Sequence, residues 1–120
     1  MTKEDAVEHL SMAEQAAEVF YKEELAGWLW VDEQGYHFVY AQSYRDSAEA
    51  RPISLSLPLQ NEEYVDSKLF PFFDNLIPEG WLLDIALKNW KLSQNDRFEL
   101  LLATGANTIG AVSVDPYPSS

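Results

Sequence analysis

The first third of the chain alternates short apolar runs with turn-forming residues. The runs lie at residues 19–21, 25–31 and 36–40, and they are separated by the polar pair Glu23–Glu24 and by residues 32–35. Short apolar runs bounded by such residues are typical of antiparallel strands joined by tight turns. The pattern therefore predicts two consecutive β-hairpins.

Two further segments have the pattern of strands. In residues 52–59 every second residue is apolar, so one face of this segment is expected to enter the core. The four apolar residues are Ile53, Leu55, Leu57 and Leu59. Pro58 cannot donate a hydrogen bond to a neighbouring strand, which predicts an edge strand or a strand end there. Residues 111–114 predict a closing strand.

Helical spacing appears at the two ends of the chain. A weak apolar stripe within residues 2–17 predicts a short, weakly docked helix or arm. The stripe consists of Ala6, Leu10, Ala13 and Ala17. From residue 69 onward, the spacing predicts a helix that ends at Pro78, a second helix to about Trp90, and a third from Ser93 to Gly105.

These elements predict a single α+β domain, in which a small, curved, mainly antiparallel sheet or partial barrel is combined with about three to four helices. A chain of 120 residues is long enough for one hydrophobic core. We expect residues 1–15 to form an N-terminal helix or arm, residues 16–115 the domain, and residues 116–120 a tail.

The chain is strongly acidic, with 20 acidic and 8 basic residues and a formal net charge of −12. An acidic surface repels phosphate backbones, so direct binding to nucleic acid is not expected. The charge either attracts a basic partner or only keeps the protein dispersed. No cysteine, signal-peptide pattern or apolar run of about 20 residues is found in the sequence. These observations predict a cytoplasmic protein with no membrane partner.

No catalytic motif is apparent in the sequence. The two histidines, His9 and His37, do not have the spacing of zinc ligands. No segment has a lysine-containing P-loop, a Gly-x-Ser-x-Gly elbow or the residue set of a protein kinase. A pair of carboxylates such as Asp74 and Glu79 stays open as an acid–base site. We expect a protein that is not an enzyme and that needs no cofactor or metal.

Four segments, in order, resemble the N-terminal subdomain of HipA-type serine/threonine kinases. They are residues 18–40 (EVFYKEELAGWLWVDEQGYHFVY), 52–59 (PISLSLPL), 72–80 (FFDNLIPEG) and 95–114 (NDRFELLLATGANTIGAVSV). The resemblance covers roughly residues 16–115, and it implies the fold of that subdomain. In those kinases, the subdomain precedes a much larger catalytic region.

The arrangement is also similar to the small antitoxins of tripartite HipBST toxin–antitoxin systems, the HipS family. In those systems, the HipT kinase lacks this subdomain and HipB is the DNA-binding member. The resemblance implies a bacterial antitoxin that binds and inhibits a HipT-like serine/threonine kinase. It also implies a larger complex, in which a HipB-like helix-turn-helix repressor is held through the kinase and this chain does not contact nucleic acid.

A protein that inhibits a kinase by binding needs a few large anchor residues, most often Trp, Tyr or Arg. Trp81 is the first candidate, because Gly80 permits an unusual backbone conformation just before it. The neighbouring candidates are Phe73, Asp74, Leu76, Ile77, Pro78 and Glu79. Alternatively, Trp81 is the first core residue of its helix, and Asp74 and Glu79 only cap helices.

Trp28 and Trp30 form a second candidate patch for partner binding. They alternate with Gly27 and Leu29, so both indoles are expected on the same face of a strand. A large apolar side chain on that face either contacts a partner or lies beneath a helix of the same chain.

Two other functions stay open at this point. The chain would be a non-catalytic accessory subunit if it completes the kinase fold and activates the kinase. It would be an acidic mimic of nucleic acid if it covers the basic face of a DNA-binding protein.

Overall fold

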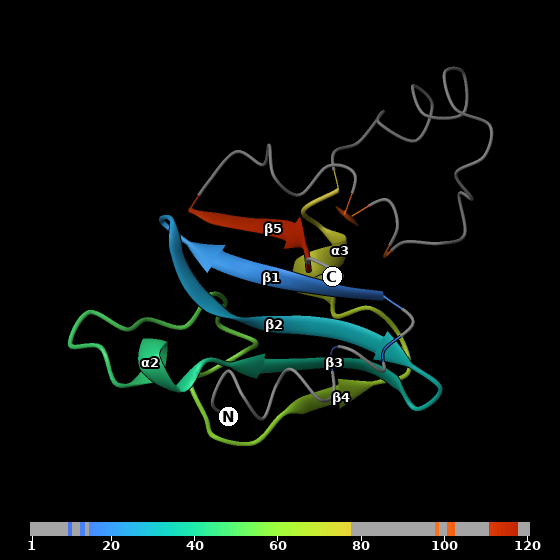
Figure 1. Ribbon diagram of the computed structural model, residues 1–120, viewed down its shortest axis with the longest axis horizontal. Helices are drawn as coiled ribbons and strands as arrows, with labels where there is room; N and C mark the ends of the chain where they lie inside the picture. The colour runs from blue at the N-terminus through green and yellow to red at the C-terminus, as the bar shows by residue number, and fades with distance from the viewer. Residues whose placement is uncertain are drawn as a thin grey trace.

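A single antiparallel sheet organises the fold (Figure 1). The computed structural model describes Leu10, Ala13, residues 15–77, Phe98, Leu101, Leu102 and residues 111–117. The five strands of the sheet are β1 (Gln15–Tyr21), β2 (Glu24–Asp32), β3 (Gly35–Tyr40), β4 (Tyr64–Asp66) and β5 (Val112–Pro116). The predicted α+β class with a mainly antiparallel sheet is therefore confirmed.

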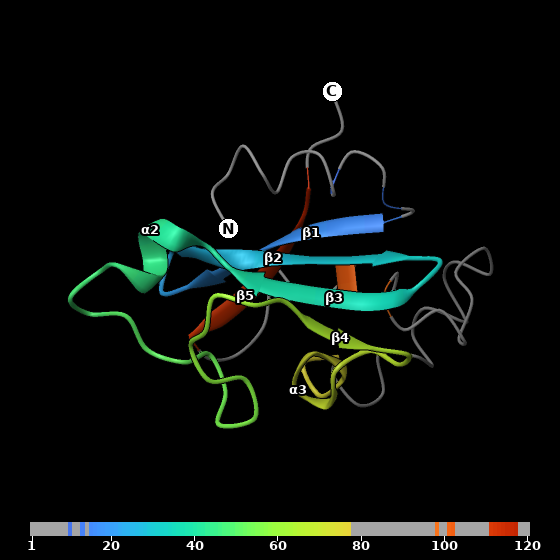
Figure 2. The ribbon, with the colours of Figure 1, turned by 90° about the horizontal axis from the view of Figure 1, so that it is seen from below.

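The strand order is β4-β3-β2-β1-β5, so the sheet is open and twisted (Figures 1 and 2). The closing strand predicted at residues 111–114 is confirmed, and it pairs antiparallel with β1. It is longer than predicted, because β5 includes Pro116 and the amide of Tyr117 donates a hydrogen bond to the Ala16 carbonyl at 2.9 Å. The ordered strand thus continues into the segment that was predicted to be a tail.

Two short helices have defined bounds in the described part of the chain, α2 (Gln42–Arg45) and α3 (Pro71–Asp74). The predicted number of three to four helices is not confirmed. The helix predicted up to about Trp90 lies outside the described residues, as does the helix from Ser93 to Gly105 except for Phe98, Leu101 and Leu102. Phe98 and Leu101 are fully buried in the core.

The last residue of the predicted N-terminal apolar stripe belongs to the sheet. Ala17 lies in β1 and is buried there, so its prediction as part of a helical face is wrong. The alternation of β1 explains the error, because Ala17 and Val19 point to one side of the strand. Leu10 is also buried in the core cluster.

The β1–β2 hairpin turns at Lys22 and Glu23, which have positive φ angles of 49° and 72°. Two successive residues of this kind form a turn whose twist matches that of the flanking strands. Tyr21 pairs with Glu24, so the turn lies one residue earlier than the predicted Glu23–Glu24 pair. The second predicted turn, at residues 32–35, is confirmed.

The register of β1 and β2 shifts between Val19 and Phe20, so that Ala26 is an extra residue in β2. Such a β-bulge bends the strand and increases its local twist. Gly27 follows directly, and a Cβ atom at this position would overlap the backbone oxygen of Val39 in β3. The close approach of β2 and β3 therefore requires glycine here.

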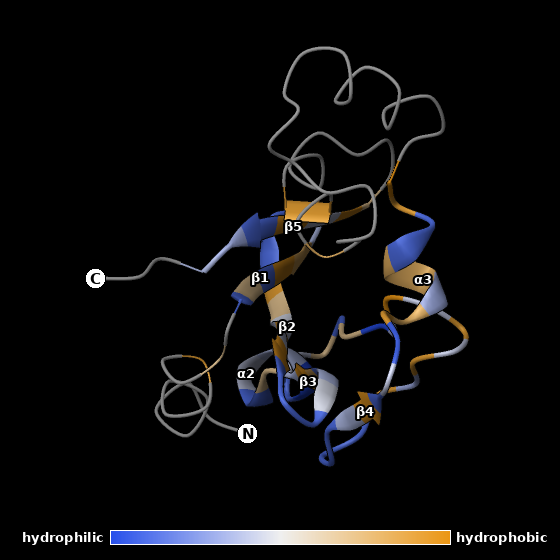
Figure 3. Cartoon of the chain, turned by 90° about the vertical axis from the view of Figure 1, so that its right-hand side faces the viewer, coloured by the Kyte–Doolittle hydropathy of each residue, from blue (hydrophilic) through white to orange (hydrophobic). Residues whose placement is uncertain are grey.

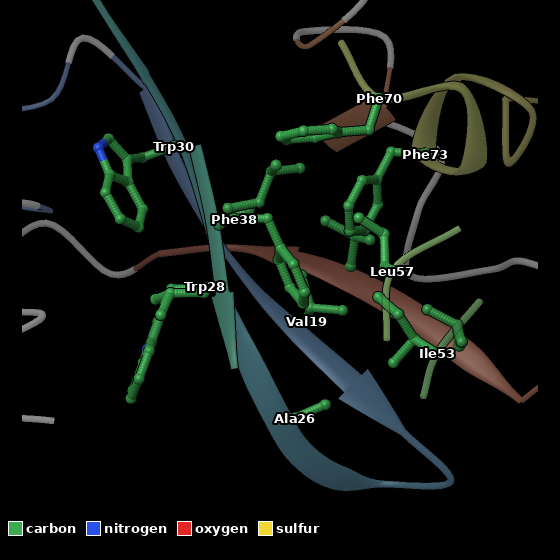
Figure 4. Packing of buried hydrophobic residues seen from close by; sticks show 14 of the residues in the cluster. Val19, Ala26, Trp28, Trp30, Phe38, Ile53, Leu57, Phe70 and Phe73 are labelled. Atoms are coloured by element: carbon green, nitrogen blue, oxygen red, sulfur yellow. The ribbon is translucent and has the colours of Figure 1, made fainter. Parts of the chain in front are cut away.

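The two faces of the sheet carry different side chains. Residues that are paired across antiparallel strands point to the same side, so the register assigns each residue to a face. Val19, Leu29 and Phe38 form the phenylalanine face. Trp28 and Trp30 form the tryptophan face on the opposite side (Figure 4). Both faces are buried in this chain.

The helix α3 lies on the phenylalanine face (Figures 2 and 3). Its Phe73 packs against Phe38 with the ring centroids 5.4 Å apart. Ile53 and Leu57 lie on the same side of the sheet (Figure 4). The core of this face is thus built by β-strands, α3 and the segment between α2 and β4.

The segment 52–59 is not a strand, contrary to the prediction. It folds into a tight turn in which Ser54 and Leu57 form an isolated bridge, and the Ser54 hydroxyl accepts a hydrogen bond from the Ser56 amide at 3.2 Å. Ile53 and Leu57 are buried as predicted, but Leu55 is fully exposed. The chain reverses its direction between Ser54 and Leu57. Residues 53, 55 and 57 therefore do not share one face, as they would in a continuous strand.

Candidate functional site

The segment around α3 holds most of the predicted anchors, and the structure separates them into two groups. Phe73 is completely buried and Ile77 is buried beside it, so both belong to the core. Phe73 contacts three aromatic rings, those of Phe38, Phe70 and Phe72. Their side chains leave little surface for a partner, since Phe73 is 0% and Ile77 is 7% exposed, and their contact with a partner stays a prediction.

Asp74 and Leu76 are half-buried, and Asn75 between them is exposed. Asn75 ends α3, where its amide donates a hydrogen bond to the Pro71 carbonyl at 2.9 Å. Asp74 and Leu76 therefore keep part of their surface for contact with another molecule. Pro78, Glu79, Gly80 and Trp81 lie outside the described residues, so their part in a binding site stays a prediction.

Trp28 and Trp30 are each 1% exposed, so they do not form the open patch that the second candidate requires. The indole Nε1 of Trp28 is buried without a hydrogen-bond partner in the described part of the chain. Trp28 therefore contributes through apolar packing. The two indoles are structural residues of the tryptophan face, and they have almost no area to offer a partner.

His37 is the one buried polar residue of the described part, and it lies beside Trp30 on the tryptophan face. Its Nε2 lies 2.8 Å from Oδ1 of Asp32, and its Nδ1 lies 3.2 Å from Oε2 of Glu63. Carboxylates only accept hydrogen bonds, so both contacts form together when both ring nitrogens carry hydrogen. From its sequence pattern His37 is a candidate metal ligand only, whereas in the structure it joins the β2–β3 turn to the segment before β4.

The pKa of Asp32 lies below its ordinary value. Burial disfavours the charged carboxylate, but the hydrogen bonds from His37, Gln34 and Gly35 and the charge of His37 together outweigh that effect. The Gln34 amide donates to Oδ1 of Asp32 at 2.8 Å. The carboxylate thus stabilises the β2–β3 turn as well as the histidine.

Two buried tyrosines hold the turn of residues 52–59. The Tyr40 hydroxyl accepts a hydrogen bond from the Ile53 amide at 3.0 Å and donates to the Leu57 carbonyl. The Tyr44 hydroxyl donates to the Arg51 carbonyl at 2.6 Å and accepts from the Arg51 amide at 3.2 Å. Burial raises the pKa of Tyr40 to about 12, so its hydroxyl keeps its proton at neutral pH.

An open cleft of about 770 Å³ lies between the β1–β2 turn and the segment after α2. Its charged lining residues are Lys22, Glu24, Glu49 and Arg51. Charges of both signs are mixed there, so the cleft does not select an anion or a cation. Among the described residues, no group of three or more acidic or histidine side chains is arranged to hold a metal ion.

No helix in the described part of the chain is long and apolar enough to cross a bilayer.

The comparisons with known proteins agree with this geometry. The family model of the HipA N-terminal domain matches residues 17–115. An uncharacterized protein of Haemophilus influenzae is 35% identical over 100 residues, which are 83% of this chain and 91% of that protein. Because the family model matches most of the chain, the chain belongs to the HipA N-terminal domain family.

Two solved structures have the same fold. An N-terminal domain of HipA toxin superposes with a TM-score of 0.68 at 30% identity, over 88% of this chain and 95% of that domain. HipA in the Shewanella oneidensis MR-1 complex with HipB and operator DNA gives a TM-score of 0.66 at 25% identity. The match covers 86% of this chain but 24% of that HipA chain. The resemblance predicted from the sequence is confirmed, and the chain corresponds to about a quarter of that HipA.

Proposed function

We propose that this chain is an antitoxin of the HipS type, which binds a HipT-like serine/threonine kinase and holds it inactive. The complex also contains a HipB-like DNA-binding protein, which is held through the kinase. The proposal rests on the share of each relative's length that this domain occupies. The region that matches this chain makes up 91% of the Haemophilus influenzae protein, but 24% of the HipA chain that was solved with HipB and DNA.

A domain that is covalently joined to a catalytic region in one protein has a surface that fits that region. Interfaces between domains of one chain resemble interfaces between separate proteins. A separate copy of the domain can therefore occupy the corresponding surface of a kinase that lacks it. In the proposed complex, this chain occupies that position on a HipT-like kinase and prevents the arrangement needed for phosphoryl transfer.

The described part of the chain supports action through surface contact and not through catalysis. Its histidine is 3% exposed, and both ring nitrogens contact carboxylates of the same chain. A general base must reach the proton that it abstracts from a substrate, and His37 is not placed to do so.

The net charge of −12 favours a partner with a basic surface. Complementary charge accelerates association and weakens as salt screens it. Binding to the kinase is therefore expected to be slower and weaker at high ionic strength, mainly through the association rate.

Co-expression tests the proposal in cells. A HipT-like kinase from the same genome is expressed with and without this chain, and growth and recovery of the complex from extract are measured. The proposal predicts growth arrest by the kinase alone, normal growth with both proteins, and co-purification of the two. Growth arrest that persists despite equal expression of this chain would contradict it.

A further inference from the structure

Leu55 is a fully exposed apolar residue at the tip of the turn of residues 52–59. Its neighbours two positions away, Ile53 and Leu57, are both buried. A single exposed leucine is ordinary on a protein surface. Leu55 differs because the backbone on both sides of it is held by buried groups.

Both ends of the turn are hydrogen-bonded to a tyrosine of the β3–α2 region. The Tyr40 hydroxyl bonds to the backbone of Ile53 and of Leu57, on the two sides of Leu55. Tyr44 holds the backbone of Arg51 in the same way, and its ring lies nearly parallel to that of Tyr40. The tip therefore presents Leu55 from a fixed position.

An apolar side chain on a fixed backbone is well suited to binding, because little backbone freedom is lost when it docks. The surrounding sequence has a second property of an interface centre. Residues 52–60 contain no charged side chain, although 23% of the residues in the chain are charged. Depletion of charge is typical of the buried core of protein–protein interfaces.

We propose that Leu55 inserts into an apolar pocket of the partner kinase, so that the turn of residues 52–59 is a docking element of the complex. This inference rests on the proposed function. A second copy of this chain is a poor occupant, because self-association would bring together two molecules that each carry a net charge of −12. The kinase must therefore present an apolar pocket without acidic residues at its rim.

Val65 provides a matched control, since it is the other large apolar residue that is exposed in the described part, at 53%. Val65 pairs with His37, which places it on the tryptophan face. Ile53 and Leu57, which carry the Leu55 turn, lie on the phenylalanine face (Figure 4). Both substitutions remove exposed apolar surface, but from opposite sides of the sheet.

The test measures the affinity of the purified full chain for a purified HipT-like kinase by isothermal titration calorimetry. Leu55→Ser is expected to weaken binding by at least about tenfold, which corresponds to burial of a leucine side chain. Leu55→Met should stay within a few-fold of the unchanged chain, because it keeps the apolar volume. Val65→Ser should bind like the unchanged chain, and thermal unfolding by circular dichroism should show all variants folded.

The inference is overturned if Leu55→Ser binds as tightly as the unchanged chain, or if Val65→Ser weakens binding equally. It is also overturned if size-exclusion chromatography with light scattering shows a dimer that Leu55→Ser dissociates. If the unchanged chain itself does not bind the kinase, the proposed function fails. If the unchanged chain binds and inhibits but Leu55 has no effect, only the docking element fails.

Discussion

His37 is stacked on Trp30, with the two rings 3° from parallel and their centroids 5.0 Å apart. The two residues are paired across β2 and β3, so the stacking closes the tryptophan face at the end of the β2–β3 hairpin. The same imidazole contacts Asp32 and Glu63 through its two nitrogens. The buried His37 side chain thus connects Trp30 on the tryptophan face to the carboxylates of Asp32 and Glu63.

This arrangement predicts a loss of stability in acid. The pKa of Asp32 is lower in the folded chain than its ordinary value of 3.8, so its contribution is present above that value and lost as pH falls below it. Asp32→Asn keeps an oxygen acceptor for His37 but removes the charge. The free energy of unfolding in urea should therefore fall less in Asp32→Asn than in the unchanged chain between about pH 5 and about pH 2.

Glu63 also faces His37, and Glu63→Gln is the companion variant. It makes the same change in charge at the other ring nitrogen of His37. An acid response of Asp32→Asn that is identical to that of the unchanged chain would contradict the role of this carboxylate.

The Tyr40 hydroxyl should stabilise the chain through the turn that it holds. Tyr40→Phe leaves the Ile53 amide and the Leu57 carbonyl without their partner. A buried backbone group without a partner lowers the free energy of unfolding by about 1–3 kcal/mol, which chemical denaturation can measure. Tyr21→Phe is the control and should change the free energy of unfolding by less than about 0.5 kcal/mol. Equal stability of the two variants would count against the anchoring of the turn.

Gly27 is predicted to tolerate no side chain. The added methyl group of Gly27→Ala would meet the Val39 carbonyl, which is backbone and cannot rotate away. Overpacking of this kind lowers the free energy of unfolding by about 1–3 kcal/mol, because the strands must separate. Urea unfolding of the purified variant measures the change, and an unchanged midpoint would show that β2 and β3 are not in such close contact.

Trp81, which follows α3 in the sequence, stays the first predicted anchor. If it is a hot spot for the kinase, Trp81→Ala should weaken inhibition by at least about 2 kcal/mol while the chain stays folded. The inhibition constant in a phosphorylation assay measures this effect. Asn75→Ala is a control from the same region, since its side chain is exposed at the end of α3. Undiminished inhibition by Trp81→Ala would remove Trp81 from the mechanism.

Most of the sheet could be predicted from the sequence, because it depends on local patterns. Strands β1 to β3 and the closing strand follow from short apolar runs and from turn residues between them. Strand β4 was not predicted, since Tyr64–Asp66 is too short to show alternation. The alternation in residues 52–59 predicts a strand instead of the observed turn, because Tyr40, which holds Ile53 and Leu57, lies 13 and 17 residues away from them in sequence.

The candidate site was predicted less well than the fold. Helical spacing shows that Phe73 and Ile77 share a face with other apolar residues, but it does not show whether that face meets the core or a partner. Burial decides this, and both residues are in the core. Leu55 was missed for the converse reason, since its spacing matches that of Ile53 and Leu57 while the turn directs it outward.

The central claim is that this chain inhibits a HipT-like kinase by binding to it. The most direct test is titration of the purified chain into a purified kinase while phosphorylation is measured. The account predicts that kinase activity falls with added chain and reaches a minimum at a fixed molar ratio. Activity that stays constant at a large molar excess of the chain, or that rises as expected for an activating subunit, would contradict it.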